Sequence, residues 1–125
     1  MLFDPDRNTV RILNVACAAD CGQVVNPDGA RNQLEGAIIQ SASWTLQEQL
    51  QYGPDGIASA DWSSYTILRF SGVPERIEVA LLDQPGQPFL GVAEAAQGPM
   101  AAALANALAQ ATGVRRHDLP LLPPA

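Results

Sequence analysis

The chain has 125 residues, 47% of them hydrophobic, and a formal net charge of −6. This length supports one hydrophobic core, so we expect residues 1–125 to form a single domain or subdomain. The acidic balance argues against nucleic-acid binding, and no apolar run reaches the ~18 residues of a transmembrane helix.

The first half of the chain predicts a strand followed by a long helix. Apolar side chains alternate along residues 10–17, as in a strand, and Asp20-Cys21-Gly22 ends it. Asn26-Pro27 is a good helix start, because asparagine caps free N–H groups and proline tolerates the first helical position. The helix should end before Gly53-Pro54. Apolar residues spaced mostly by four predict its buried stripe: Ala30, Leu34, Ala37, Ile38, Ala42, Leu46 and Leu50.

The second half predicts short strands and a second helix. We expect strands at residues 57–59, 65–70 and 77–82, and a loop at residues 84–88. A helix should cover residues 99–112 and stop at Gly113. Residues 119–125 cannot continue a helix and should be extended, either docked on a neighbouring surface or loose. The predicted order is β-α-β-β-α, an α+β fold.

The two cysteines, Cys17 and Cys21, do not predict a metal site. Structural zinc requires four ligands, and the single histidine, His117, lies nearly a hundred residues away. An iron–sulfur cluster needs four cysteines, which this chain cannot supply. We therefore expect two reduced cysteines that pack as small apolar groups near a strand end.

One carboxylate, Glu94, stands out because a glycine and a Gly-Pro turn frame it just before the second helix. Gly91 lets the backbone approach a ligand closely, and Gly98-Pro99 predicts a turn into the helix. A carboxylate on such a tightly shaped loop suits a catalytic base. The alternative is that Glu94 complements the positive end of the following helix, and the residues alone favour this alternative.

The first helix carries a second candidate, the face formed by Gln33, Gly36 and Gln40. These residues lie at i, i+3 and i+7 and share one side of a helix. Gly36 costs about 1 kcal/mol relative to alanine in a helix interior, so close approach of a cofactor or another backbone would explain it. The alternative is that Gly36 permits helix-on-sheet packing while both glutamines are solvated.

Three blocks of sequence occur in the order found in one known family. GVAEAAQGPMAAALANALAQATGVRRHDLP resembles the carboxy-terminal signature of molybdopterin-binding large subunits of the xanthine dehydrogenase and aldehyde oxidase family. AADCGQVVNPDGARNQLEGAIIQ is similar to that family's D-x-G, N-P and Q-x-E-G elements, and YTILR is a weaker third block. The resemblance covers about residues 10–122. It is nearest the bacterial branch with isoquinoline oxidoreductase and nicotinate dehydrogenase.

The resemblance implies a role for each candidate residue. Glu94 would be the catalytic base of a molybdenum hydroxylase that oxidises aldehydes or N-heterocycles with water as the oxygen source. Gln33 would contact the pterin, and the expected cofactor-binding set is Gln33, Gly36, Gln40, Gly91, Val92 and Ala93. Two residues depart from the family pattern. Ala93 replaces a glycine of G-V-G-E, which requires a negative φ, and Ser41 stands where the helix often carries glycine.

The resemblance also implies partners. The cofactor would be molybdenum-molybdopterin, often the cytosine dinucleotide form in bacteria, with iron–sulfur clusters on a partner chain. The family's large subunit is several times longer than 125 residues. We therefore expect the isolated chain to need the remainder of that subunit and to be inactive alone.

Two other functions stay open. The chain could be a non-catalytic structural or assembly module that binds no cofactor on its own. A pterin- or nucleotide-binding protein without chemistry is disfavoured, because no glycine-rich phosphate loop opens a helix. The amino terminus lacks a signal-peptide pattern, but the start of a fragment says nothing about the targeting of its parent. The localisation stays open, with the cytoplasm favoured and the periplasm possible for the parent enzyme. The substrate and the electron acceptor also stay open.

Overall fold

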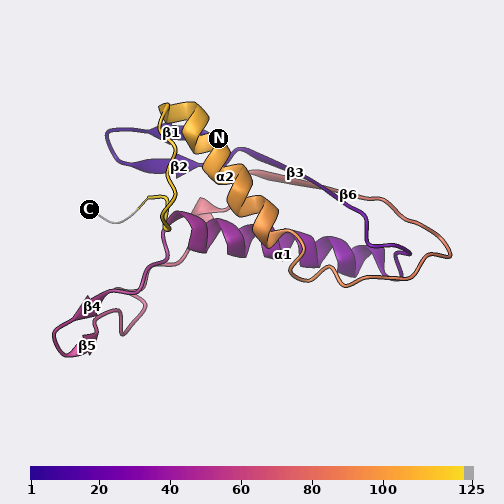
Figure 1. Ribbon diagram of the computed structural model, residues 1–125, viewed down its shortest axis with the longest axis horizontal. Coiled ribbons are helices and arrows are strands. Elements are labelled where there is room, and N and C mark those ends of the chain that lie inside the picture. The colour runs from indigo at the N-terminus through magenta and orange to yellow at the C-terminus, as the bar shows by residue number, and fades with distance from the viewer. Residues whose placement is uncertain (123–125) are drawn as a thin grey trace.

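The computed structural model describes residues 1–122, in which a parallel strand pair and two crossed helices form the main body (Figure 1). β3 (Asn14–Ala19) and β6 (Arg76–Leu81) pair in parallel, with Val15 opposite Ile77. Parallel strands require a crossover connection, and α1 (Pro27–Leu46) forms part of it. α2 (Gln97–Thr112) packs against α1. The predicted α+β class is confirmed.

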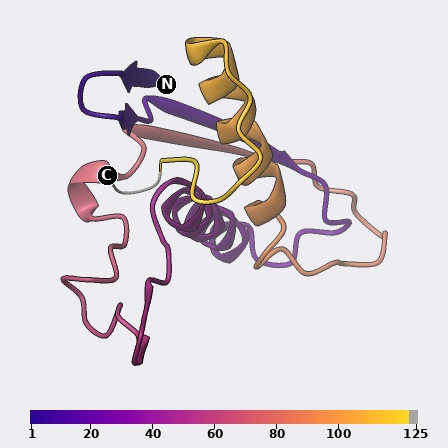
Figure 2. The same ribbon diagram turned by 60° about the vertical axis from the view of Figure 1, so that its left-hand side comes forward.

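Two hairpins and a short 3₁₀ helix complete the fold. β1 (Leu2–Asp4) pairs with β2 (Thr9–Arg11), and β4 (Tyr52–Gly53) pairs with β5 (Gly56–Ile57), both antiparallel. The 3₁₀ helix is η1 (Phe70–Gly72). Figure 2 looks nearly along α1 and shows the segment with β4 and β5 extending away from the helices and β3–β6. No helix among residues 1–122 is both long and apolar enough to span a membrane.

The core lies between the β3–β6 pair and the two helices. Alternate residues of β3, including Val15 and Cys17, face this core, while Asn14 and Ala16 are exposed. Most of the predicted α1 stripe is buried, which confirms its apolar spacing. The buried hydrophobic cluster consists of Ile12, Leu34, Ala37, Ile38, Ala42, Leu46, Ala96, Met100, Leu104, Leu108 and Leu121.

The start of α1 and its end before Gly53 are confirmed, but the helix is shorter than the predicted stripe, which ran to Leu50. Asn26 is the N-cap and its side chain accepts a hydrogen bond from the Gly29 N–H, while Pro27 occupies the first turn. The helix ends at Leu46, well before Gly53. The C-terminal tail explains this early end, because the Leu121 N–H donates to the Thr45 carbonyl and the Leu122 N–H to the Leu46 carbonyl. Leu50 consequently lies outside the helix and is 47% exposed.

The same two hydrogen bonds show that the tail docks on α1. Leu121 is buried, and the Arg116 guanidinium donates to its carbonyl oxygen. Residues 123–125 of the predicted extended segment lie outside the described residues. The alternative of a loose tail is therefore wrong for Leu121 and Leu122.

The other corrections concern strand and helix boundaries. The predicted strand at 10–17 is two strands, because β2 pairs with β1 whereas β3 begins at Asn14 and pairs with β6. Residues 65–70 form no strand; the Leu68 N–H instead donates to the Ser43 hydroxyl of α1. α2 begins at Gln97, two residues before Pro99. Its predicted end is confirmed, because Gly113 adopts φ 73° at the C-cap, a left-handed conformation that favours glycine.

Candidate functional site

The loops that follow β3 and β6 lie side by side at one end of the sheet. Parallel pairing brings the carboxyl ends of both strands to the same edge. The Leu90 N–H donates to the Cys21 carbonyl at 2.8 Å, and the Gln84 N–H donates to the Gly22 carbonyl at 3.0 Å. Gly22 has φ 73°, and a Cβ there would lie only 2.0 Å from the Pro88 carbonyl oxygen. A glycine is therefore required where the two loops meet.

A groove of about 350 Å³ lies between these loops and the start of α1. It brings Gln33 of α1 together with Gly91 and Val92, three of the residues predicted from the sequence. None of its lining side chains carries a charge. The lining consists of Cys21, Gln23, Val24, Val25, Asn26, Gly29, Ala30, Gln33, Phe89, Leu90, Gly91 and Val92.

Farther along α1, Gln40 is joined to the first residue of α2. The Gln97 side-chain amide donates a 2.7 Å hydrogen bond to Gln40 Oε1, and the buried Ser41 hydroxyl donates to the Gln97 carbonyl at 2.7 Å. Gln33, Gly36 and Gln40 are all exposed, so this chain's own core does not cover that face. Segment 89–97 therefore lies along the glutamine side of α1: its start lines the groove together with Gln33, and its last residue is hydrogen-bonded to Gln40.

Glu94 is exposed and belongs to the turn between the groove and α2. Within residues 1–122 its carboxylate makes no hydrogen bond or ion pair. It precedes the α2 N-cap, Ala96, by two residues, and no side chain caps this helix. The Glu94 carbonyl accepts a hydrogen bond from the Gln97 N–H at 3.1 Å. The backbone is thus tied to α2, while the carboxylate has no partner among residues 1–122.

The backbone accommodates Ala93, which stands where the family pattern has glycine. Among residues 1–122, Asn8 is the only non-glycine residue with a positive φ, so Ala93 meets the requirement stated for it. A Cβ built on Gly36 or Gly91 would contact nothing within 4 Å. Helix-on-sheet packing within the described chain is therefore the wrong explanation for Gly36.

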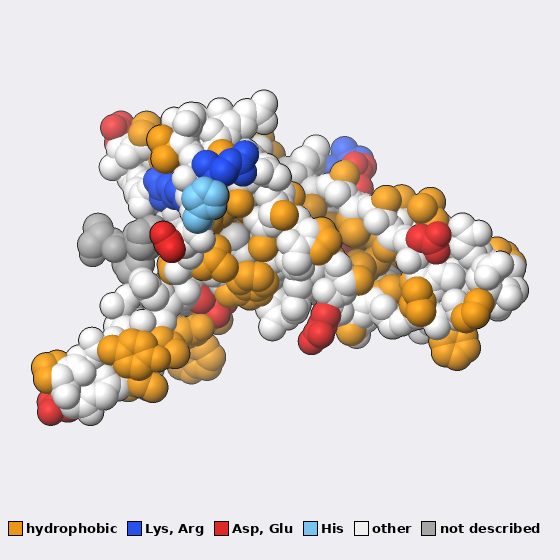
Figure 3. All heavy atoms as spheres, viewed as in Figure 1, with side chains coloured by type: hydrophobic (Ala, Val, Ile, Leu, Met, Phe, Trp, Pro, Cys, Tyr) orange, Lys and Arg blue, Asp and Glu red, His pale blue; other side chains and the backbone are white. Residues whose placement is uncertain are grey.

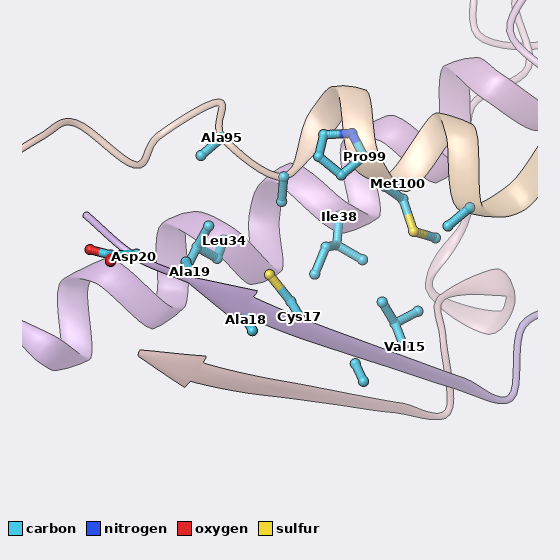
Figure 4. Close-up of a pocket in the computed structure, with 13 residues that line it drawn as sticks. Val15, Cys17, Ala18, Ala19, Asp20, Leu34, Ile38, Ala95, Pro99 and Met100 are labelled. Atoms are coloured by element: carbon cyan, nitrogen blue, oxygen red, sulfur yellow. The ribbon is translucent and has the colours of Figure 1, made fainter. Parts of the chain in front are cut away.

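A second cavity, of about 420 Å³, lies between β3 and the two helices and was not predicted from the sequence (Figure 4). Cys17 from β3, Ile38 from α1 and Met100 from α2 contribute to its mainly apolar lining. Burial raises the pKa of the Cys17 thiol, which favours the neutral form. Both cysteines are free, and no group of three or more potential metal-ligating side chains occurs among residues 1–122.

The arrangement of strands and helices is that of known molybdenum hydroxylases. The Cu,Mo-containing CO dehydrogenase matches 89% of this chain with a TM-score of 0.77 at 19% identity, a likeness in fold that covers 14% of that chain. Quinoline 2-oxidoreductase from Pseudomonas putida 86 matches 89% of this chain with a TM-score of 0.73 at 27% identity.

Sequence comparison assigns the family. The profile of the molybdopterin cofactor-binding domain matches residues 2–74, which include Gln33, Gly36 and Gln40. A nicotinate dehydrogenase subunit of Pseudomonas putida is 42% identical over 93% of this chain. The beta subunit of isoquinoline 1-oxidoreductase from Brevundimonas diminuta is 36% identical over 97%. The chain therefore belongs to the molybdopterin-binding subunits of the xanthine dehydrogenase family, in its bacterial branch. It spans 10% and 15% of the lengths of these two relatives.

Sequence reasoning missed the residues that connect the candidate site. Gln97 and Ser41 were not among the predicted site residues, although Ser41 was noted as a departure from glycine. A buried hydroxyl on a helix needs an acceptor, and this requirement is the signal that could have indicated a partner for Ser41.

Proposed function

We propose that this chain forms one wall of the cofactor site of a molybdenum hydroxylase and supplies Glu94 as the general base. The observation that carries the proposal is a free, exposed carboxylate on a turn that Gln97 ties to the glutamine face of α1. A carboxylate that only served α2 would be expected at the cap or in the first turn, and both positions lack an acidic residue.

The donors around the groove fit a molybdopterin. Within residues 1–122, the backbone N–H groups of Gly91, Val92, Ala93 and Glu94 have no hydrogen-bond acceptor. Gln33 adds a neutral amide, which both donates and accepts hydrogen bonds and so matches the mixed edge of a pterin ring. Backbone N–H groups also suit the phosphate oxygens of the cofactor, including a cytosine dinucleotide form.

In this proposal the chain contributes position and proton transfer. The bound molybdenum cofactor supplies the oxygen transfer and accepts the electrons of the substrate. The Glu94 carboxylate would accept a proton in the reaction, and the turn that contains Glu94 would hold this carboxylate in position. Gln33 orients the pterin by hydrogen bonding from α1. A general base of this kind contributes ~10²–10⁴-fold to the rate.

The proposal includes further protein partners and a small substrate. The relatives named above are individual subunits of their enzymes, which supports a multi-subunit assembly. In this proposal, iron–sulfur clusters on another chain accept the electrons. Their names point to N-heterocycles, and aldehydes remain in the proposed range. Because one wall is not a complete site, the isolated chain should contain essentially no molybdenum. Elemental analysis showing near-stoichiometric metal would contradict this.

The test of the catalytic role is the Glu94→Gln variant of the complete enzyme. Glutamine preserves size and most hydrogen bonding but cannot accept the proton. Turnover should fall at least ~10²-fold while molybdenum content stays at the wild-type level. Normal turnover at normal molybdenum content would overturn the proposal.

A second candidate function, a non-catalytic assembly module, is favoured by one surface. Large apolar side chains are exposed on the segment containing β4 and β5 and on the residues that follow it (Figure 3). Phe70 is 94% exposed. Trp62, Tyr52 and Ile57 are exposed there as well. Such surfaces usually bind another protein surface. If Trp62→Ser abolished assembly while Glu94→Gln left turnover intact, the structural function would be the correct one.

A further inference from the structure

Three hydrogen bonds converge on Gln97, where α2 begins. Its backbone N–H donates to the Glu94 carbonyl at 3.1 Å, and its side-chain amide donates to Gln40 at 2.7 Å. Its carbonyl accepts from the Ser41 hydroxyl at 2.7 Å, and Ser41 is 0% exposed. One residue thus connects the Glu94 turn to two successive positions of α1.

We propose that Gln97, together with Ser41, is a positioning device for the Glu94 carboxylate, an inference that rests on the proposed function of Glu94. The first turn of α2 has no side-chain cap, so local capping does not fix the preceding turn. The Gln97 contacts replace that cap. They fix the distance between the turn and α1, which carries Gln33 and Gln40.

Gln97 makes one buried and one exposed hydrogen bond to α1. The Ser41 bond is buried, so loss of the hydroxyl leaves the Gln97 carbonyl without this donor. The Gln40–Gln97 bond is exposed and contributes direction more than stability. Below them, Ala96 and Met100 are buried and hold the start of α2 in the core.

The functional consequence is that Glu94 and the proposed cofactor-contacting amides move as one unit. Misplacement of a reacting group by about 1 Å can reduce a rate by ~10²-fold. Gln97 touches neither substrate nor cofactor in this account. It acts through the position of Glu94.

The test uses the complete enzyme with Gln97→Met and, separately, Ser41→Ala. Methionine preserves the length and helix propensity of glutamine but lacks the amide. The reductive half-reaction should slow ~10- to 100-fold in Gln97→Met, with substrate Kd and molybdenum content unchanged. Amide hydrogen exchange at positions 95 and 97, whose N–H groups donate to backbone carbonyls of this turn, should become faster in both variants. Gln110→Met is the matched control, because Gln110 is exposed on the same helix and its side chain makes no hydrogen bond among residues 1–122.

A double variant separates positioning from general damage. If Gln97 acts through Glu94, adding Gln97→Met to Glu94→Gln should slow the reaction no further. Two results would overturn the positioning role but leave the proposed function of Glu94 intact. In the first, the rate losses of Gln97→Met and Glu94→Gln are fully additive in the double variant. In the second, Gln97→Met has the wild-type rate and wild-type amide exchange although Glu94→Gln is slow. A wild-type rate in Glu94→Gln would overturn the proposed function and, with it, the positioning role. The exchange rates would then show only whether Gln97 holds the turn.

Discussion

Gln97 and Gln40 are 57 positions apart in the sequence, and their side chains share a 2.7 Å hydrogen bond. This bond joins the turn that carries Glu94 to the helix that carries Gln33. Each segment belongs to a different motif block of the sequence, and neither forms a site alone. Helix crossing brings the two blocks together, since α2 packs across α1 (Figure 1).

Gly36→Ala should have opposite effects on the stability of the fold and on the binding of the cofactor. A Cβ at this exposed helical position meets nothing within 4 Å in the chain, so alanine should stabilise the fold by up to ~1 kcal/mol. If the pterin approaches the Gly36 backbone, the same variant should retain less molybdenum in the complete enzyme. Denaturant unfolding measures the first effect and elemental analysis the second. Full molybdenum retention would show that no close approach occurs there.

Asn26→Ala should weaken the start of α1. The Asn26 side chain accepts a 3.0 Å hydrogen bond from the Gly29 N–H, and losing such a cap costs about 1 kcal/mol. A lower denaturation midpoint with an unchanged slope is the expected result. Asn32→Ala is the control, because Asn32 is exposed within the same helix and its replacement by alanine should not destabilise the fold. Equal losses in both variants would argue against the cap.

Leu34→Ala should lower the free energy of unfolding much more than Leu50→Ala, although both residues belong to the apolar stripe predicted from the sequence. Leu34 is 1% exposed in the core cluster, so its truncation should cost about 2–5 kcal/mol. Leu50 is 47% exposed beyond the helix end, and its truncation should cost less than ~0.5 kcal/mol. Thermal or denaturant unfolding of the two variants measures the difference. Similar losses would mean that Leu50 is buried in the assembled protein.

Local signals in the sequence predicted much of the helical structure. Asn26-Pro27 and Gly113 predicted helix ends correctly because capping depends on a few neighbouring residues. The end of α1 was not predictable in the same way. It depends on hydrogen bonds from Leu121 and Leu122, whose positions follow from the complete fold. The division between β2 and β3 likewise depends on their different partner strands.

The sequence predicted the candidate site residues Glu94 and Gln33, but not the hydrogen bonds that connect their segments. Motif spacing singled out Glu94 and Gln33 because each lies in a short, recognisable block. Gln97 lies in the same block as Glu94, but nothing in its spacing marked it as a site residue, and its role follows from the crossing of two helices. Ser41 gave a faint signal, since a hydroxyl on a buried helix face needs an acceptor.

The most direct measurement is the rate of enzyme reduction by saturating substrate in the complete enzyme carrying Glu94→Gln. Asp6→Asn is the matched control, because Asp6 is an exposed carboxylate outside the motif blocks, and its side chain makes no hydrogen bond or ion pair among residues 1–122. With molybdenum content equal in the wild-type enzyme and both variants, the account predicts a loss of at least ~10²-fold for Glu94→Gln and a wild-type rate for Asp6→Asn. A Glu94→Gln enzyme that is fully loaded and reduced at the wild-type rate would contradict the account, because Glu94 could not then be the base.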